Sequence, residues 1–101
     1  MVRNDIPPGN QMVQSIHAVA DFAIEHSPQF KAWQHGSNYL CCLSTTQLKL
    51  HQLIDKLIDH NINFTIFREP DLDNELTAIA VEAIPMSDHN FFFKNFKLGL
   101  R

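Results

Sequence analysis

The sequence predicts an α/β domain, a three-layer α/β/α sandwich around a four-stranded mixed sheet. Short runs of β-forming residues alternate along the chain with amphipathic helical stretches, a pattern typical of helices packed on a sheet. A short loop joins the last two strand runs, so we expect them to pair antiparallel and to make the sheet mixed. With 101 residues, 45% of them hydrophobic, residues 1–101 are expected to form a single domain.

The first part of the chain is predicted to contain one strand end and two helices. Residues 1–5 fit the end of a strand but are few for a central one, so either the given sequence begins within that strand or the strand is really this short. The run Pro7-Pro8-Gly9 then forces a turn, and a helix is expected over residues 10–25. The Ser27-Pro28 pair suits the start of a second, shorter helix, which ends near Gly36.

The second part of the chain is predicted to alternate strands and helices. A buried strand, a helix, two strands and a closing helix are expected, in this order, over residues 38–43, 44–60, 62–67, 76–83 and 88–96. Ser44 and Gln47 match a capping box at the start of the long helix. Its apolar stripe is expected to lie in the core, with Leu53, Ile54 and Leu57 under the sheet.

Charge and cysteine content restrict the classes of partner. The net charge of −3 gives no general attraction to nucleic acid, so DNA is not expected and RNA would need a local basic patch. Cys41 and Cys42 are adjacent and point to opposite faces of a strand, so they do not form an ordinary disulfide. This cysteine usage, without a signal-peptide pattern or a membrane-spanning apolar run, predicts a cytoplasmic protein.

The start of the first helix combines polar and apolar faces. Gln14 and His17 are three residues apart and share one helix face. A separate apolar stripe at the same period consists of Met12, Ile16, Val19, Ala20 and Ala23. A helix N-terminus favours an anion, so the two polar residues either contact a ligand there or border the buried face.

Several motifs in fixed order carry a resemblance to a known family. They are Arg3-x-Asp5, Gly9, Gln14-x-x-His17-Ala18, Trp33, Arg68-Glu69-Pro70-Asp71-Leu72 and Thr77-Ala78-Ile79-Ala80. In this order the chain resembles the type-2 peptidyl-tRNA hydrolases of archaea and eukaryotes, and in particular a divergent bacterial branch of that superfamily. The resemblance covers nearly the whole chain but misses most of the first strand.

The resemblance implies an activity and a fold. It implies a three-layer domain, often a homodimer, that hydrolyses the ester joining a peptide to the 3′ end of tRNA, without metal or organic cofactor. The family places a Lys at the first helix, where this chain has Asn10 or Gln11. Its loop Asp is best matched by Glu69, its loop Thr has no counterpart, and Thr77 matches a structural Thr instead.

These matches define the candidate site, and the resemblance implies that residues 9–18 and 68–75 lie side by side to form it. His17, Gln14 and Glu69 are the catalytic candidates, because a His titrates near neutral pH and a carboxylate can align a water. The candidates for substrate binding are Asn10, Gln11, Asp5, Arg68 and Asp71. His51, Asp55 and Asp59 have metal-ligand spacing on a helix, but a solvated polar face accounts for them and no metal site is expected.

Two functional hypotheses remain open at this point. The retained Gln14-x-x-His17-Ala18 favours a tRNA ester hydrolase, with peptidyl-tRNA or another tRNA ester as its partner. The missing Lys and Thr favour a non-catalytic binding or dimerisation module that kept the fold. In both cases the Phe91-Phe92-Phe93 run predicts a homodimer, because one small domain does not easily bury three adjacent rings.

Overall fold

The computed structural model describes residues 1–98 and has the expected α/β class. Its strands are β1 (Val2–Arg3), β2 (Leu43–Thr45), β3 (Phe64–Glu69), β4 (Glu75–Val81) and β5 (Lys97–Leu98). Its helices are α1 (Pro8–Glu25), α2 (Ser27–His35), α3 (Gln47–Asp59) and α4 (His89–Phe93), with two short 3₁₀ turns, η1 (Pro70–Leu72) and η2 (Met86–Asp88).

The sheet is mixed and has five strands in the order β3-β4-β1-β2-β5. β1 lies in the middle, parallel to β2 and antiparallel to β4, and it consists of two residues, Val2 and Arg3. The expectation of four strands is wrong, because Leu43 and Leu98 pair antiparallel and add β5 at the edge. A two-residue edge strand leaves no periodic pattern in a sequence, so its existence depends on the tertiary pairing.

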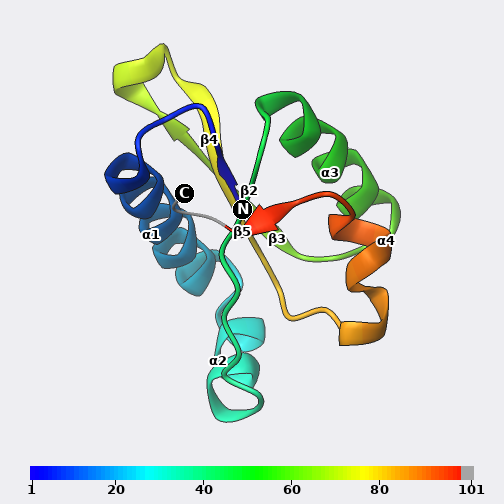
Figure 1. Cartoon of the computed structure of the whole chain (residues 1–101). Coiled ribbons are helices and arrows are strands. Elements are labelled where there is room, and N and C mark those ends of the chain that lie inside the picture. Colours follow the sequence, from blue (N-terminus) through cyan, green and yellow to red (C-terminus); the bar gives the residue numbers. More distant parts are fainter. Residues whose placement is uncertain (99–101) are drawn as a thin grey trace.

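Helices lie on both faces of the sheet (Figure 1). α1 packs on β3 and β4, where the small side chains of Ala78 and Ala80 meet Ala18 and Phe22. On the other face of the sheet, Ile79 of β4 contacts α3. β4 is therefore buried on both faces, which explains why its sequence is an almost continuous apolar run.

α1 turns an unexpected face toward the sheet. Its buried residues are Gln11, Gln14, Ala18 and Phe22. Met12 and Ile16 of the predicted apolar stripe are instead 50% and 60% exposed. The helix orientation is thus set by polar contacts of the two glutamines at its first turns and by Ala18 and Phe22 further along, and not by the most apolar stripe.

Two element boundaries differ from the prediction around β2. The buried strand expected over residues 38–43 begins at Leu43, and Ser44 lies inside β2 because it pairs with Val2. The capping box starting at Ser44 is therefore wrong. Thr46 caps α3 instead, with its side chain accepting a hydrogen bond from the Lys49 backbone N–H at 3.2 Å.

The closing helix is shorter than expected. Residues 88–96 were predicted as one helix, but α4 ends at Phe93, and the chain turns at Asn95, which has a positive φ of 70°. That reversal directs Lys97 and Leu98 back to the edge of the sheet as β5. Asparagine tolerates the left-handed conformation better than most residues, so Asn95 is the local signal that the helix could not continue.

α3 presents its predicted core residues to the sheet and to α4. Leu53 and Leu57 are buried, and Ile54 is partly buried against the β4 cluster. Leu57 also belongs to the cluster around Phe92, so it links α3 to α4. Within residues 1–98, no helix is long and apolar enough to cross a membrane.

We predict that Leu57→Ala lowers the free energy of unfolding by about 2–5 kcal/mol, because the side chain is fully buried and its removal leaves a cavity. Leu48→Ala is the matched control on the same helix, since Leu48 is 67% exposed, and it should stay within about 0.5 kcal/mol of the parent. Urea melts of both variants measure the difference. Equal losses would mean that α3 packs through another face.

Candidate functional site

A hydrogen-bonded bridge joins α1 to the ends of two strands. The hydroxyl of Thr77 in β4 donates to Oε1 of Gln14 at 2.9 Å. The other end of the same amide donates from Nε2 to Oε2 of Glu69, the last residue of β3, also at 2.9 Å. The first helix and the residue 68–75 segment, which the resemblance placed together, therefore lie in direct contact.

An irregularity in the β3–β4 ladder brings Thr77 into this bridge. Phe67 pairs with Ala78 while Arg68 pairs with Leu76, so Thr77 has no direct partner across the ladder. A β-bulge of this kind leaves one residue outside the alternation and redirects its side chain. Thr77 and Ala78 consequently both face α1, and Thr77 is fully buried.

The turn after β3 holds the Glu69 carboxylate in place. Oε1 of Glu69 accepts a hydrogen bond from the Asp71 backbone N–H at 3.2 Å, which caps the η1 turn. Asp73 and Asn74 follow with positive φ values of 54° and 60°, a conformation that these two residue types tolerate. Glu69 is thus fixed from two sides, by Gln14 and by the turn.

The only buried guanidinium of residues 1–98 sits beside this bridge, but its charge is already matched. Arg3 makes two hydrogen bonds to the Asp5 carboxylate, at 2.9 and 2.7 Å, and one to Glu75 at 2.9 Å. The hydrogen bonds from Arg3 lower the pKa of the Asp5 carboxyl and raise the pKa of the guanidinium. Arg3 is therefore a structural cation that organises the strand ends.

His17 lies next to the bridge on the exposed side of α1. Its ring stacks on Phe67 with centroids 4.6 Å apart and planes within 6°. α1 runs opposite to β3, with Gln14 beside Glu69 and His17 beside Phe67. Phe67 and Glu69 are two residues apart, about 7 Å along an extended strand, so His17 and Glu69 come together at the same end of β3.

The remaining predicted site residues are divided between the surface and the core. Asn10 and Asp71 are exposed, and Arg68 is exposed with a long hydrogen bond of 3.5 Å to the Asn74 carbonyl. Gln11 is fully buried and donates to the Ile6 carbonyl at 2.8 Å, so it holds the turn before α1 and does not face a ligand.

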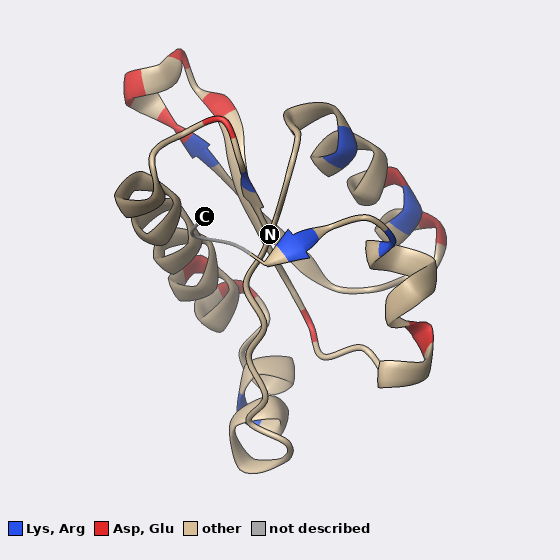
Figure 2. Ribbon diagram, in the orientation of Figure 1, with Lys and Arg blue, Asp and Glu red and all other residues tan. Residues whose placement is uncertain are grey.

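Carboxylates dominate the surface around the bridge. Figure 2 shows acidic positions at the turn between β3 and β4 and in the segment between β1 and α1. The acidic residues of these two segments are Asp5, Glu69, Asp71, Asp73 and Glu75. Arg68 is the nearby cation without a carboxylate partner among the described residues. The local field therefore favours water and cations over phosphates.

The family resemblance implies a structural role for Thr77, and in the structure its hydroxyl contacts Gln14 of the candidate site directly. Its hydroxyl fixes which way the Gln14 amide points, because a donor on Oε1 leaves the NH₂ group for Glu69. The signal in the sequence was a threonine, able to donate, within the apolar run Leu76-Thr77-Ala78-Ile79. The sequence does not show that Gln14 is the partner of Thr77, because this contact depends on the β-bulge.

Comparison of the chain with models of known families finds no match, and comparison with curated proteins finds no significant one.

We predict that the Gln14–Thr77 contact is energetically coupled. Gln14→Met should lower the free energy of unfolding by about 1–3 kcal/mol, because it removes both hydrogen bonds of a buried amide. In a double-mutant cycle with Thr77→Val, the coupling should be about 0.5–1.5 kcal/mol.

The matched control for this cycle is Gln52→Met on the exposed face of α3, which should change stability by less than about 0.5 kcal/mol. Denaturant melts of the two single variants and the double variant supply the cycle. Additive losses would show that the two side chains do not act as a pair.

Proposed function

We propose that this chain is a peptidyl-tRNA hydrolase-like protein that hydrolyses the ester between a peptidyl or aminoacyl group and tRNA. The observation that carries the proposal is the Gln14–Glu69 hydrogen bond, since the family resemblance implies a site built from these two segments. The proposal includes the family's three-layer sandwich and a cytoplasmic location. Apolar clusters on both faces of the sheet support the layered architecture.

The proposed chemistry divides the catalytic roles between Glu69 and His17. Gln14 and the Asp71 N–H occupy one lone pair on each Glu69 oxygen, so the remaining lone pairs can align a water for attack on the ester. His17 is exposed beside that position and serves as the general acid or base. Gln14 acts as a positioning residue, because both ends of its amide are engaged within the chain.

The proposed site is poor in positive charge. Arg3 is paired with Asp5 and Glu75, so it does not offer a free cation to a phosphate or an oxyanion. What remains is the start of α1, where the space beside Gly9 is open and Asn10 is exposed. A missing electrostatic donor typically costs about 10²–10³ in rate, so we expect weak activity.

We predict that hydrolysis of an N-acetyl-aminoacyl-tRNA by the purified chain falls by about 10²-fold or more in Glu69→Gln and in His17→Ala, because each removes a proton acceptor for the attacking water. Glu69→Gln keeps an oxygen that can accept from Gln14, so the fold is retained. Release of radiolabelled amino acid from the tRNA measures the rate.

Asp73→Asn is the control for Glu69→Gln. It removes one charge from the same turn, keeps the size of the side chain and suits the positive φ at this position, so the rate should not change.

Asn10→Lys should raise the rate by restoring a cation at the exposed start of α1. Equal activity of His17→Ala and the parent would make His17 a structural residue.

A specific observation also favours a second candidate, a non-catalytic binding module. The excess of carboxylates around Glu69 repels the phosphates of tRNA and would slow its approach. A module of this kind would show no ester cleavage in the parent or in Asn10→Lys, whereas the hydrolase shows cleavage that increases in Asn10→Lys. The same assay therefore separates the two candidates.

We also propose a homodimer, with its interface on α1. Phe92 is buried and Phe93 partly buried, so only Phe91 of the phenylalanine run remains half exposed. The outer face of α1 offers a larger apolar surface formed by Met12, Val13, Ile16 and Ile24. Charged residues are absent from α1 until Asp21, so this face suits a second uncharged face of the same kind.

We predict that light scattering at tens of micromolar finds a dimer and that Ile16→Glu converts it to a monomer, because it places a charge in the apolar interface. Leu48→Glu is the control, since Leu48 is equally apolar and 67% exposed on α3. A parent chain that is monomeric under these conditions would contradict the proposal. Dissociation by Leu48→Glu alone would move the interface to α3.

A further inference from the structure

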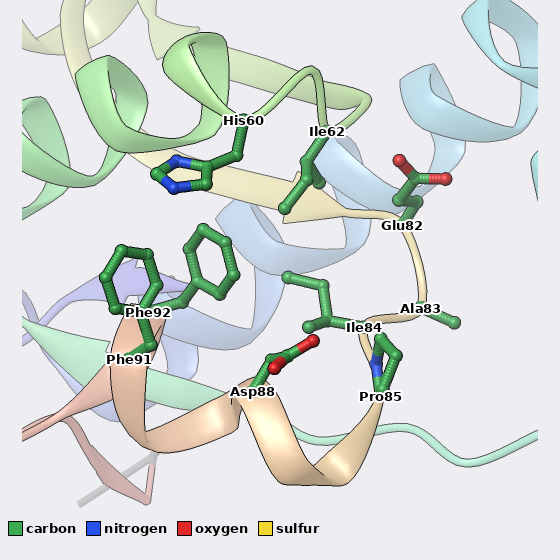
Figure 3. A pocket seen from close by; sticks show the side chains of 9 residues that line it. All are labelled: His60, Ile62, Glu82, Ala83, Ile84, Pro85, Asp88, Phe91 and Phe92. Carbon is green, nitrogen blue, oxygen red and sulfur yellow. The ribbon is translucent and has the colours of Figure 1, made fainter.

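A second site-like feature lies at the opposite end of β4 from the Gln14 bridge. It is a pocket of about 560 Å³ between the end of α3, the segment after β4 and the η2–α4 region (Figure 3). This volume is within the range of small-molecule sites. The residues that line it are His60, Ile62, Glu82, Ala83, Ile84, Pro85, Asp88, Phe91 and Phe92.

Three rings form one wall of the pocket and hold one another in place. His60 packs edge-on against Phe91 and Phe92, with centroids 5.0 and 5.5 Å away, and the two phenylalanines are themselves perpendicular at 4.9 Å. Nδ1–H of His60 donates to the Lys56 carbonyl at 2.9 Å, which fixes the imidazole. The aromatic wall is therefore preformed.

Apart from the His60 imidazole, the polar side chains that line the pocket are carboxylates. The Asp88 carboxylate points into it and makes no hydrogen bond or ion pair within residues 1–98 (Figure 3). Glu82 accepts a hydrogen bond from the Asn63 N–H at 2.8 Å through one oxygen and keeps the other free. Lysine and arginine are absent from the lining residues, so the pocket carries an unbalanced negative charge.

The neighbouring lysine shows that this wall accepts a cation. The ammonium of Lys56 lies 4.6 Å from the centroid of the Phe91 ring and donates to the Phe91 carbonyl at 2.9 Å. It lines the adjacent groove and not the pocket, so it leaves the charge of Asp88 unmatched. A cation on the pocket side would meet the aromatic wall together with a free carboxylate.

We propose that this pocket binds a small organic cation, a primary ammonium carried on an apolar body. The apolar body would contact Ile62, Ile84 and the aromatic wall, and the ammonium would donate to Asp88. An anion is excluded by the two carboxylates, and a neutral apolar ligand would desolvate them without replacing the lost hydrogen bonds.

The pocket is independent of the proposed hydrolase site. Thr77 of the Gln14 bridge and Ala83 of the pocket wall are six residues apart along an extended segment, which corresponds to about 20 Å. A ligand in the pocket therefore does not touch Glu69 or His17. Binding there can be tested without reference to tRNA cleavage.

The test compares probes that share a shape and differ in charge. The full chain is titrated with 2-phenylethylamine, 2-phenylethanol and phenylacetate, and backbone amide shifts are followed by NMR. We expect 2-phenylethylamine to shift the amides of the lining residues and to bind about tenfold or more tightly than the neutral alcohol, with no binding of phenylacetate. Capped lysine amide is the fourth probe, and its tighter binding would identify the ammonium as that of a peptide side chain.

Variants then assign the charge recognition to the pocket. Asp88→Asn should weaken 2-phenylethylamine binding by about tenfold or more, and Asp73→Asn at the distant turn should not change it. Glu82→Gln removes the other carboxylate charge of the pocket and keeps an oxygen that accepts from the Asn63 N–H. It tests the charge recognition if Asp88→Asn does not fold. Equal binding of the amine and the alcohol, unchanged binding in Asp88→Asn, or no lining shifts with either ammonium probe would overturn the proposal.

Discussion

The amide of Gln14 is the constraint on which the arrangement of the first helix depends. It is buried between the Thr77 hydroxyl and the Glu69 carboxylate, so its burial is compensated only when α1, β3 and β4 meet in this one orientation. Rotating α1 by one residue to bury Met12 or Ile16 would separate these groups and leave them desolvated without partners. The helix therefore exposes its most apolar stripe.

How much of this the sequence could predict varies from element to element. β3, β4 and α3 follow from local patterns, because alternation and a 3.6-residue stripe survive in the folded protein. The pairing of Gln14 with Glu69 was reachable through the family resemblance. The role of Thr77 could not be predicted, because it arises from a shift in register between Phe67 and Arg68. β5 could not be predicted either, because two residues at an edge carry no periodicity. In each failure a long-range contact decided the local structure.

The electrostatics of the candidate site follow from how the short β1 is held. Arg3 reaches from the central strand to Asp5 and Glu75, and this network brings acidic segments together around Glu69. A guanidinium that is paired with two carboxylates supports the fold, but it is no longer available to bind a polyanion. The same arrangement that orders the strand ends thus disfavours a polyanion at this edge, which bears on the proposed tRNA hydrolase and on the proposed binding module alike.

β4 connects two regions with different electrostatic character. Its first residues meet α1, where every polar side chain of the bridge has a partner within the chain, and the segment after its end borders a pocket in which the Asp88 carboxylate has no partner among residues 1–98. A group left free in this way contributes nothing to the fold that a neutral residue would not. A network in which every polar group has a partner fixes a single geometry. A free carboxylate beside an aromatic wall is different, because removing its water is costly unless a cation binds there in exchange. The strand therefore joins a region whose polar groups hold helix and strands in one geometry to a region whose free carboxylate has no such role in the fold.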